Sequence, residues 1–258
     1  LRIELEGPDC PLLAAPEELA ELAGLMEAPM RLEDQDGDHL TLIQQEPLMA
    51  VAGIAARKKD GETVSGDAGT YFKRGDGTLY VLLCDGMGSG PQANRESSLA
   101  LRLLEQFLQA GVETEHALVT LNSALALRGE EAGGFTTVDL LQVDLFTGDG
   151  VVFKLGAAPT YVRKGGTVRR ISGASLPAGL AEERSAPDRF PIHLSPGDCV
   201  LLVSDGVTGT EDDSWLRERL VKFDQGSPKE LARDLITHSP QGATDDSTAL
   251  VIRLEKRE

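Results

Sequence analysis

Two short apolar stretches of the chain are each followed by an Asp-Gly pair, and this repetition constrains the fold strongly. Residues 81–84 (VLLC) run directly into the pair at 85–86, and residues 200–203 (VLLV) reach the pair at 205–206 one residue later. Short, wholly apolar runs of this kind are typical of strands buried on both faces. An aspartate at the end of such a strand holds its carboxylate at the rim of a sheet. The glycine after it lets the backbone turn, which leaves the glycine carbonyl free to face the same space.

Further aspartates lie beside predicted strands. Asp67 ends the segment SGD, and Asp245 and Asp246 come just before the apolar run at 247–254. Carboxylate, carbonyl and water oxygens are the ligands that hard divalent cations prefer. An ordinary turn is sufficient to explain any one Asp-Gly pair, whereas several such sites beside strands favour a metal site.

The chain from residue 40 onward alternates between short strands and pairs of helices. Helical spacing of leucines predicts helices at 91–110 and 114–127, and two more are predicted at 214–222 and 228–237. Hairpin-linked strands interrupted by helix pairs indicate antiparallel sheets with helices packed outside, not alternating βαβ units. The predicted strands are 40–44, 49–56, 68–73, 79–84, 136–146, 151–155, 160–164, 167–171, 199–204 and 247–254.

The first residues of the chain form a separate piece in this prediction. Residues 1–38 are interpreted as an N-terminal appendage made of a short helix at 17–26 and an acidic loop at 31–39. Residues 39–258 then form the main domain. A chain of 258 residues is long enough for one large domain with such an addition.

Composition excludes several classes of partner. The chain carries 42 acidic and 25 basic residues, a net charge of −17, and a field of that sign repels nucleic acid and anionic lipid surfaces. No run approaches the roughly 20 apolar residues that a membrane helix needs. The three cysteines, Cys10, Cys84 and Cys199, are widely spaced and show neither a disulfide framework nor a zinc pattern. These features predict a cytoplasmic domain that binds no nucleic acid.

Five motifs follow one another along the chain: VSGD (64–67), DGMGSG (85–90), FTTVDL (135–140), SDG (204–206) and DDST (245–248). Their order resembles the PPM family of protein phosphatases, and within it the phosphatase domain of the stage II sporulation protein E family. The resemblance covers residues from about 49 to the C-terminus and is specific in wording over 64–90. It implies an α+β fold in which two packed antiparallel β-sheets are flanked by α-helices, with a two-metal centre at one edge.

The resemblance also implies roles for individual residues. Asp85 would bridge both metal ions, and the carbonyl of Gly86 would bind one of them. Asp67 would be a further ligand of that same ion.

Asp205 and Asp245 would bind the other ion, and Asp246, which stands where many relatives have asparagine, is a weaker candidate. An oxygen-rich ligand set without cysteine or histidine suits Mn²⁺ or Mg²⁺ better than zinc. The resemblance implies two such ions and leaves a third open.

The function implied is that of a Mn²⁺- or Mg²⁺-dependent phosphoprotein phosphatase, a phosphoric monoester hydrolase that uses metal-activated water. Its substrate would be a phosphoserine or phosphothreonine signalling protein, such as an anti-anti-sigma factor, in bacterial sporulation or stress control. No substrate-binding residue is assigned. Homodimerisation is left open, and an upstream region, as in relatives, would attach the full-length protein to a membrane.

Two other classes of function are open to such a chain. A regulatory binding module, or pseudophosphatase, would keep this fold with weak or no activity, and the complete set of aspartates argues against it. A calcium-stabilised adhesion or carbohydrate module would predict a secretion signal, which the sequence does not show.

Overall fold

The computed structural model describes residues 1–127, 134–180, 186–209, 212–224 and 226–257. Within these residues the chain forms two units. The first unit is Leu1–Met49 together with the residues from Lys256 onward, and the second is Ala50–Glu255.

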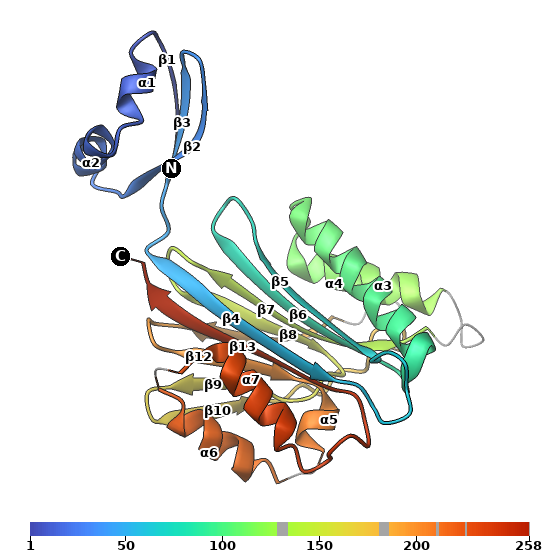
Figure 1. Ribbon diagram of the computed structural model, residues 1–258. Coiled ribbons are helices and arrows are strands. Elements are labelled where there is room, and N and C mark those ends of the chain that lie inside the picture. The colour runs from blue at the N-terminus through green and yellow to red at the C-terminus, as the bar shows by residue number, and fades with distance from the viewer. Residues whose placement is uncertain (128–133, 181–185, 210–211, 225, 258) are drawn as a thin grey trace. The chain divides into compact units, whose positions relative to one another are not determined.

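The first unit is a three-stranded antiparallel sheet with two short helices (Figure 1). Its strand order is β1-β3-β2, and its small core combines Cys10, Met30, Leu40 and Leu42. The elements are β1 (Arg2–Glu6), α1 (Cys10–Leu13), α2 (Pro16–Leu25), β2 (Met30–Asp36) and β3 (His39–Gln44).

This unit corrects part of the sequence prediction. The helix expected at 17–26 is confirmed as α2, but the acidic loop expected at 31–39 is wrong, because most of it is strand β2. Only Met30 of β2 is buried, and its acidic residues face solvent, so the strand lacks the apolar alternation that identifies strands in sequence. Since β3 pairs with both β1 and β2, the unit extends past residue 38 to Met49.

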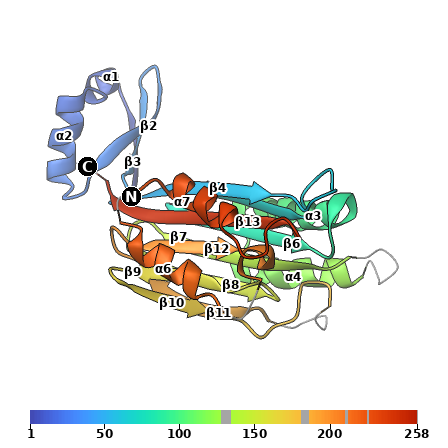
Figure 2. The same ribbon diagram turned by 60° about the horizontal axis from the view of Figure 1, so that its bottom comes forward.

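The second unit contains two five-stranded antiparallel sheets (Figure 2). Their strand orders are β10-β9-β12-β13-β4 and β11-β8-β7-β6-β5. The strands are β4 (Leu48–Arg57), β5 (Asp67–Lys73), β6 (Thr78–Gly86), β7 (Thr136–Asp144), β8 (Asp149–Leu155), β9 (Thr160–Lys164), β10 (Thr167–Ile171), β11 (Asp188–His193), β12 (Cys199–Val203) and β13 (Ser247–Lys256).

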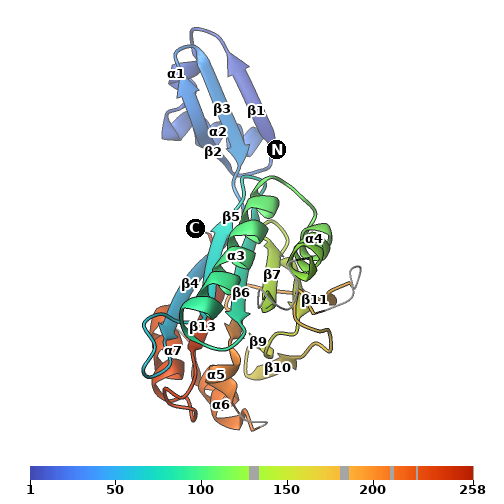
Figure 3. The ribbon, with the colours of Figure 1, turned by 90° about the vertical axis from the view of Figure 1, so that its right-hand side faces the viewer.

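Helices cover the outer face of each sheet in the second unit (Figures 1 and 3). Helices α3 and α4 cover the sheet that contains β6, and α5, α6 and α7 cover the sheet that contains β12. The fold class expected from the resemblance is therefore confirmed. The helices are α3 (Gly90–Gln109), α4 (Thr114–Ala126), α5 (Asp205–Thr208), α6 (Ser214–Lys222) and α7 (Pro228–Thr237).

Strand β6 shows why its sequence is wholly apolar. Tyr80, Leu82 and Cys84 contact the leucines of α3 and α4, while the alternate residues Val81 and Leu83 are buried on the opposite face. A strand covered by helices on one side and by a second sheet on the other exposes neither face to water. The same arrangement applies to β12, all five residues of which are buried.

A buried polar group connects the two sheets. The ammonium of Lys154 on β8 lies 2.8 Å from Oδ1 of Asp139 on β7 and donates to Oγ1 of Thr160 on β9 over 2.8 Å. Both charged residues are 1% exposed. The Thr160 hydroxyl in turn donates to the other oxygen of Asp139, at 2.5 Å. Asp139 lies in the predicted motif at 135–140, so this motif contributes to the contact between the sheets.

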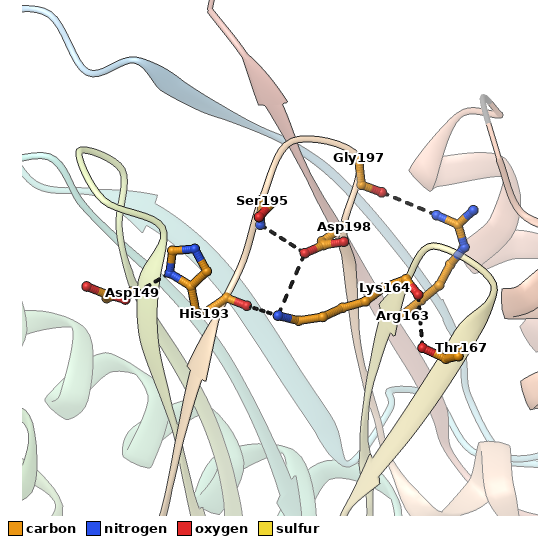
Figure 4. A network of polar contacts seen from close by, with 8 residues as sticks. All are labelled: Asp149, Arg163, Lys164, Thr167, His193, Ser195, Gly197 and Asp198. Carbon is orange, nitrogen blue, oxygen red and sulfur yellow. Dashed lines mark hydrogen bonds and ion pairs between the residues drawn. The ribbon is translucent and has the colours of Figure 1, made fainter.

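A second, more exposed network links β9 to β11 (Figure 4). The Lys164 ammonium donates to the carbonyl of His193 and lies 4.0 Å from Oδ2 of Asp198. The imidazole of His193 shares a hydrogen bond of 2.9 Å with Asp149 on β8, and this bond lowers the pKa of the Asp149 carboxyl. The network thereby joins β11, an edge strand of one sheet, to β9, the second strand of the other sheet.

The composition of the chain predicts cysteines without a disulfide framework and no membrane-spanning helix. Cys10, Cys84 and Cys199 are all buried free thiols. Burial raises the pKa of both the Cys84 and the Cys199 thiols, which keeps them in the neutral form. Among the described residues, no helix combines the length and the apolar character that crossing a bilayer requires.

Candidate metal centre

Strand ends of both sheets bring the predicted aspartates together. Asp67 begins β5 and Asp85 lies near the end of β6, and the antiparallel register pairs these two residues directly. Asp205 begins α5 one residue after the end of β12, and Asp245 lies in the loop that leads into β13. Because β6 and β12 belong to different sheets, the cluster exists only where the two sheets meet.

A cavity of about 290 Å³ lies in front of this cluster. Asp85, Gly86, Asp205 and Asp245 all line it. Asp67 does not line the cavity; it is 8% exposed and interacts electrostatically with Asp85. The other residues that line the cavity are Lys59, Met87, Gly88, Phe135, Thr136, Thr137 and Pro177.

The aspartates are close enough to repel one another. Burial, followed by the charges of Asp67, Asp205 and Asp245, raises the pKa of the Asp85 carboxyl to about 9. Burial is also the main reason that the pKa of Asp67 rises to about 6, and the pKa of Asp205 rises through burial and the charge of Asp245. A cluster of carboxylates held in this way favours either a proton or a cation.

One buried oxygen of Asp67 lacks a partner. Its Oδ2 accepts a hydrogen bond of 2.7 Å from the Ser204 hydroxyl, which itself accepts from the N–H of Thr248 at 2.8 Å. Its Oδ1 is buried and has no hydrogen-bond partner in the described part of the chain. An unpaired buried carboxylate oxygen is costly, so this oxygen, beside three further carboxylates, fits a hard cation.

The carboxylates do not by themselves enclose an ion. Among the described residues, no group of three acidic, histidine or cysteine side chains has the geometry that would hold a metal ion as it stands. The fit to a cation therefore rests on the all-oxygen donor set, on the mutual repulsion and on the unpaired Asp67 oxygen.

The two glycines that follow Asp85 and Asp205 allow close approach of other backbone segments. A Cβ on Gly86 would lie 2.1 Å from the carbonyl oxygen of Ala93 on α3. A Cβ on Gly206 would lie 1.9 Å from the carbonyl oxygen of Asp246. The Asp-Gly pairs thus bring helix α3 and the loop before β13 against the strand ends.

Asp246 is engaged elsewhere than in the cavity. It is 3% exposed, and its two carboxylate oxygens accept hydrogen bonds from the N–H groups of Lys59 and Gly66, at 2.9 and 2.8 Å. The carboxylate thus holds the loop between β4 and β5 against the loop before β13. This use differs from the ligand role that the resemblance suggests.

Sequence reasoning missed several cavity residues, among them Lys59. It belongs to no recognised motif, and its one signal is its position between a predicted strand and the motif at 64–67. Thr136 lies in a recognised motif, and its hydroxyl donates to the carbonyl of Asp85 over 2.7 Å. That bond holds the end of β6 against the start of β7.

Two helix-covered antiparallel sheets with an aspartate cluster at their common edge define a phosphatase domain of the PPM, or PP2C, class. More specifically, the chain belongs to the stage II sporulation protein E (SpoIIE) family, whose model matches residues 75–255. The solved structure of the PP2C phosphatase domain and a fragment of the regulatory domain of the cell-fate determinant SpoIIE from Bacillus subtilis is 25% identical. It superposes with a TM-score of 0.80, covering 100% of this chain and 79% of that one.

Two curated relatives extend the comparison. Stage II sporulation protein E of Priestia megaterium is 31% identical over 212 residues, which cover 79% of this chain and 36% of the relative. Phosphoserine phosphatase RsbU of Bacillus subtilis (strain 168) is 23% identical over 181 residues, which cover 69% of this chain and 52% of RsbU. The match therefore spans about a third of the length of the Priestia protein.

Proposed function

We propose that the second unit is a divalent-metal-dependent protein phosphatase that hydrolyses phosphoserine or phosphothreonine. The observation that carries this proposal is that Asp85, Asp205 and Asp245 face one cavity while Asp67 pairs with Asp85 across the adjacent strand. The name of RsbU, a phosphoserine phosphatase, supports the same chemistry.

The residues that would hold the metal follow from this arrangement. Asp67, Asp85 and the Gly86 carbonyl would serve one ion, and Asp205 and Asp245 the other. Oxygen donors without cysteine or histidine favour Mn²⁺ or Mg²⁺. When bound, such ions supply Lewis acidity, which activates water as a nucleophile and offsets negative charge on the phosphoryl oxygens.

The remaining residues of the site keep these carboxylates in place. Thr136 fixes the carbonyl of Asp85, and Ser204 donates to Asp67. Phe135, Met87 and Pro177 form apolar parts of the cavity wall. Preorganised donors and walls of this kind limit the rearrangement that a reaction needs.

We assign the phosphatase domain to Ala50–Glu255, which contains the whole family match, and an accessory role to the first unit. The solved SpoIIE relative includes a fragment of a regulatory domain and covers 100% of this chain, which supports a regulatory origin for the first unit. The substrate is proposed to be a phosphorylated signalling protein of the anti-anti-sigma type, as the family relation suggests.

The test is hydrolysis of para-nitrophenyl phosphate by the purified chain with Mn²⁺, with a chelator, and after Asp85→Asn. We expect turnover that requires Mn²⁺ and falls by at least about a hundredfold in the variant, since Asp85 is central to the carboxylate cluster. Asp38→Asn, at an exposed residue of the first unit, is the matched control and should retain activity.

Absence of turnover on this ester and on a phosphoserine peptide would overturn the enzymatic proposal. A binding module with the same fold would then be the better interpretation, because such a module keeps the sheets and helices without hydrolysis.

A further inference from the structure

The cavity in front of the aspartates has one cation among its described lining residues, Lys59. We propose that Lys59 binds the phosphoryl group of the substrate and positions it against the aspartate cluster. The inference rests on the proposed phosphatase function, and it assigns the phosphate-binding residue that the sequence motifs leave open.

The backbone of Lys59 is tied to the loop that carries Asp245. The N–H of Lys59 donates to Oδ1 of Asp246 over 2.9 Å, and the next N–H, that of Asp60, donates to the carbonyl of Ala243 over 2.9 Å. Asp246 is buried and follows Asp245 directly. The main chain of Lys59 is thereby held beside that of Asp245, at the wall of the cavity.

Neighbouring contacts hold the rest of this loop. The other oxygen of Asp246 accepts from Gly66 over 2.8 Å, and the side-chain amide of Asn94 on α3 donates to the carbonyl of Ser65 over 2.8 Å. The Ser89 hydroxyl donates to Glu62 over 3.0 Å. Since hydrogen bonds hold both ends of the loop, the backbone of Lys59 is fixed in position while its side chain reaches the cavity.

The adjacent Lys58 provides a contrast. Its ammonium donates to the carbonyl of Glu62 within the same loop, and its side chain is exposed and does not line the cavity. Lys59 is half-buried and, among the described residues, forms neither an ion pair nor a side-chain hydrogen bond. The ammonium of Lys59 is therefore available to a ligand in the cavity.

The charges of the cavity single out Lys59 as a group for a phosphomonoester. Among the described lining residues, the other charged side chains are the carboxylates assigned to the metal ions, whereas Lys59 offers up to three charge-assisted hydrogen bonds to phosphoryl oxygens. A lysine is a flexible point charge and does not impose the fork geometry of arginine.

The experiment compares Lys59→Met, Lys59→Arg and the matched control Lys58→Met in the whole chain loaded with Mn²⁺. Kinetics on a phosphoserine peptide and inhibition by inorganic phosphate report on the site, and calorimetry measures phosphate binding directly. For Lys59→Met we expect KM and the inhibition constant of phosphate to rise roughly tenfold to a hundredfold, as for the loss of charged hydrogen bonds. Lys59→Arg should restore most of this loss, and Lys58→Met should match the wild type.

Three results would overturn the inference: equal phosphate affinity in Lys59→Met and wild type, equal losses in both methionine variants, or a weakened Mn²⁺ affinity in Lys59→Met that accounts for the change. If the wild type hydrolyses nothing, the proposed function fails, but calorimetry with inorganic phosphate still decides the role of Lys59. Thermal midpoints identify a variant that fails to fold, in which case Lys59→Gln takes its place.

Discussion

Asp85 lies where burial and three other aspartates oppose its negative charge. Folding raises the pKa of Asp85 from 3.8 to about 9 and that of Asp67 from 3.8 to about 6. Between about pH 4 and pH 9, the native state therefore binds more protons than the unfolded chain. It follows that the metal-free protein loses stability as the pH rises from about 4 to about 9.

Removing this charge should stabilise the metal-free protein. We expect Asp85→Asn to raise the thermal midpoint in chelator at pH 8, by about 2–4 °C for each kcal/mol recovered. The gain should shrink toward pH 4, where the carboxyl of the native wild type is protonated and carries no charge to repel its neighbours. Thermal unfolding followed across this pH range makes the comparison.

Added Mn²⁺ should reverse the order of the two proteins, since a ligand that binds only the native state stabilises it by an amount that rises with the logarithm of its affinity. A thermal midpoint that is equal or lower for Asp85→Asn in chelator at pH 8 would contradict the account of repulsion in the cluster.

Single residues of the site differ in how far they could be predicted. Asp67, Asp85, Asp205 and Asp245 follow strands or turns that are visible in the sequence, and the structure brings all of them to one edge. Lys59 could not be found, because its position depends on a hydrogen bond to a residue 187 positions away. Local patterns carry no information about such long-range contacts.

At the scale of elements, the buried group of Asp139, Lys154 and Thr160 joins strands of the two sheets. Lys154→Met should lower the free energy of unfolding by about 3–5 kcal/mol, because it leaves the Asp139 carboxylate buried without a counter-charge. The double variant Asp139→Leu with Lys154→Met should recover much of this loss, since no unpaired charge is left.

Urea unfolding of the single and double variants measures both effects. Lys222→Met is a control, because the exposed pair of Lys222 with Glu218 contributes little to stability. A double variant as unstable as Lys154→Met alone would show that the ion pair itself, and not the stranded charge, stabilises the contact.

The strands and helices that could be predicted are those with strong apolar periodicity. Helices α3 and α4 and the apolar strands β6 and β12 begin and end within a few residues of the prediction. The strands β1, β2 and β11 were missed, and in each most side chains are not buried, so their sequences show little apolar character. All three are edge strands, held by the backbone pairing of one neighbour.

At the scale of the molecule, the first unit has its own small core. The four aspartates of the candidate metal centre all lie in the second unit. A chain that starts at Pro47 should therefore fold and keep Mn²⁺-dependent hydrolysis within about threefold of the longer chain, as expected for an independent domain. Hydrolysis of para-nitrophenyl phosphate and the thermal midpoint test this. A truncated chain that folds but loses its activity would assign the first unit a direct part in catalysis.

The strand order of the second unit has a consequence for synthesis. Strand β4 is an edge strand whose one neighbour is β13, and about 190 residues of chain separate the two. A chain emerging from the ribosome exposes β4 before β13 exists, so β4 stays unpaired until the residues of β13 have been synthesised. Asp245 lies two residues before β13, and hence the cavity gains this carboxylate and β4 gains its neighbour at nearly the same point of synthesis.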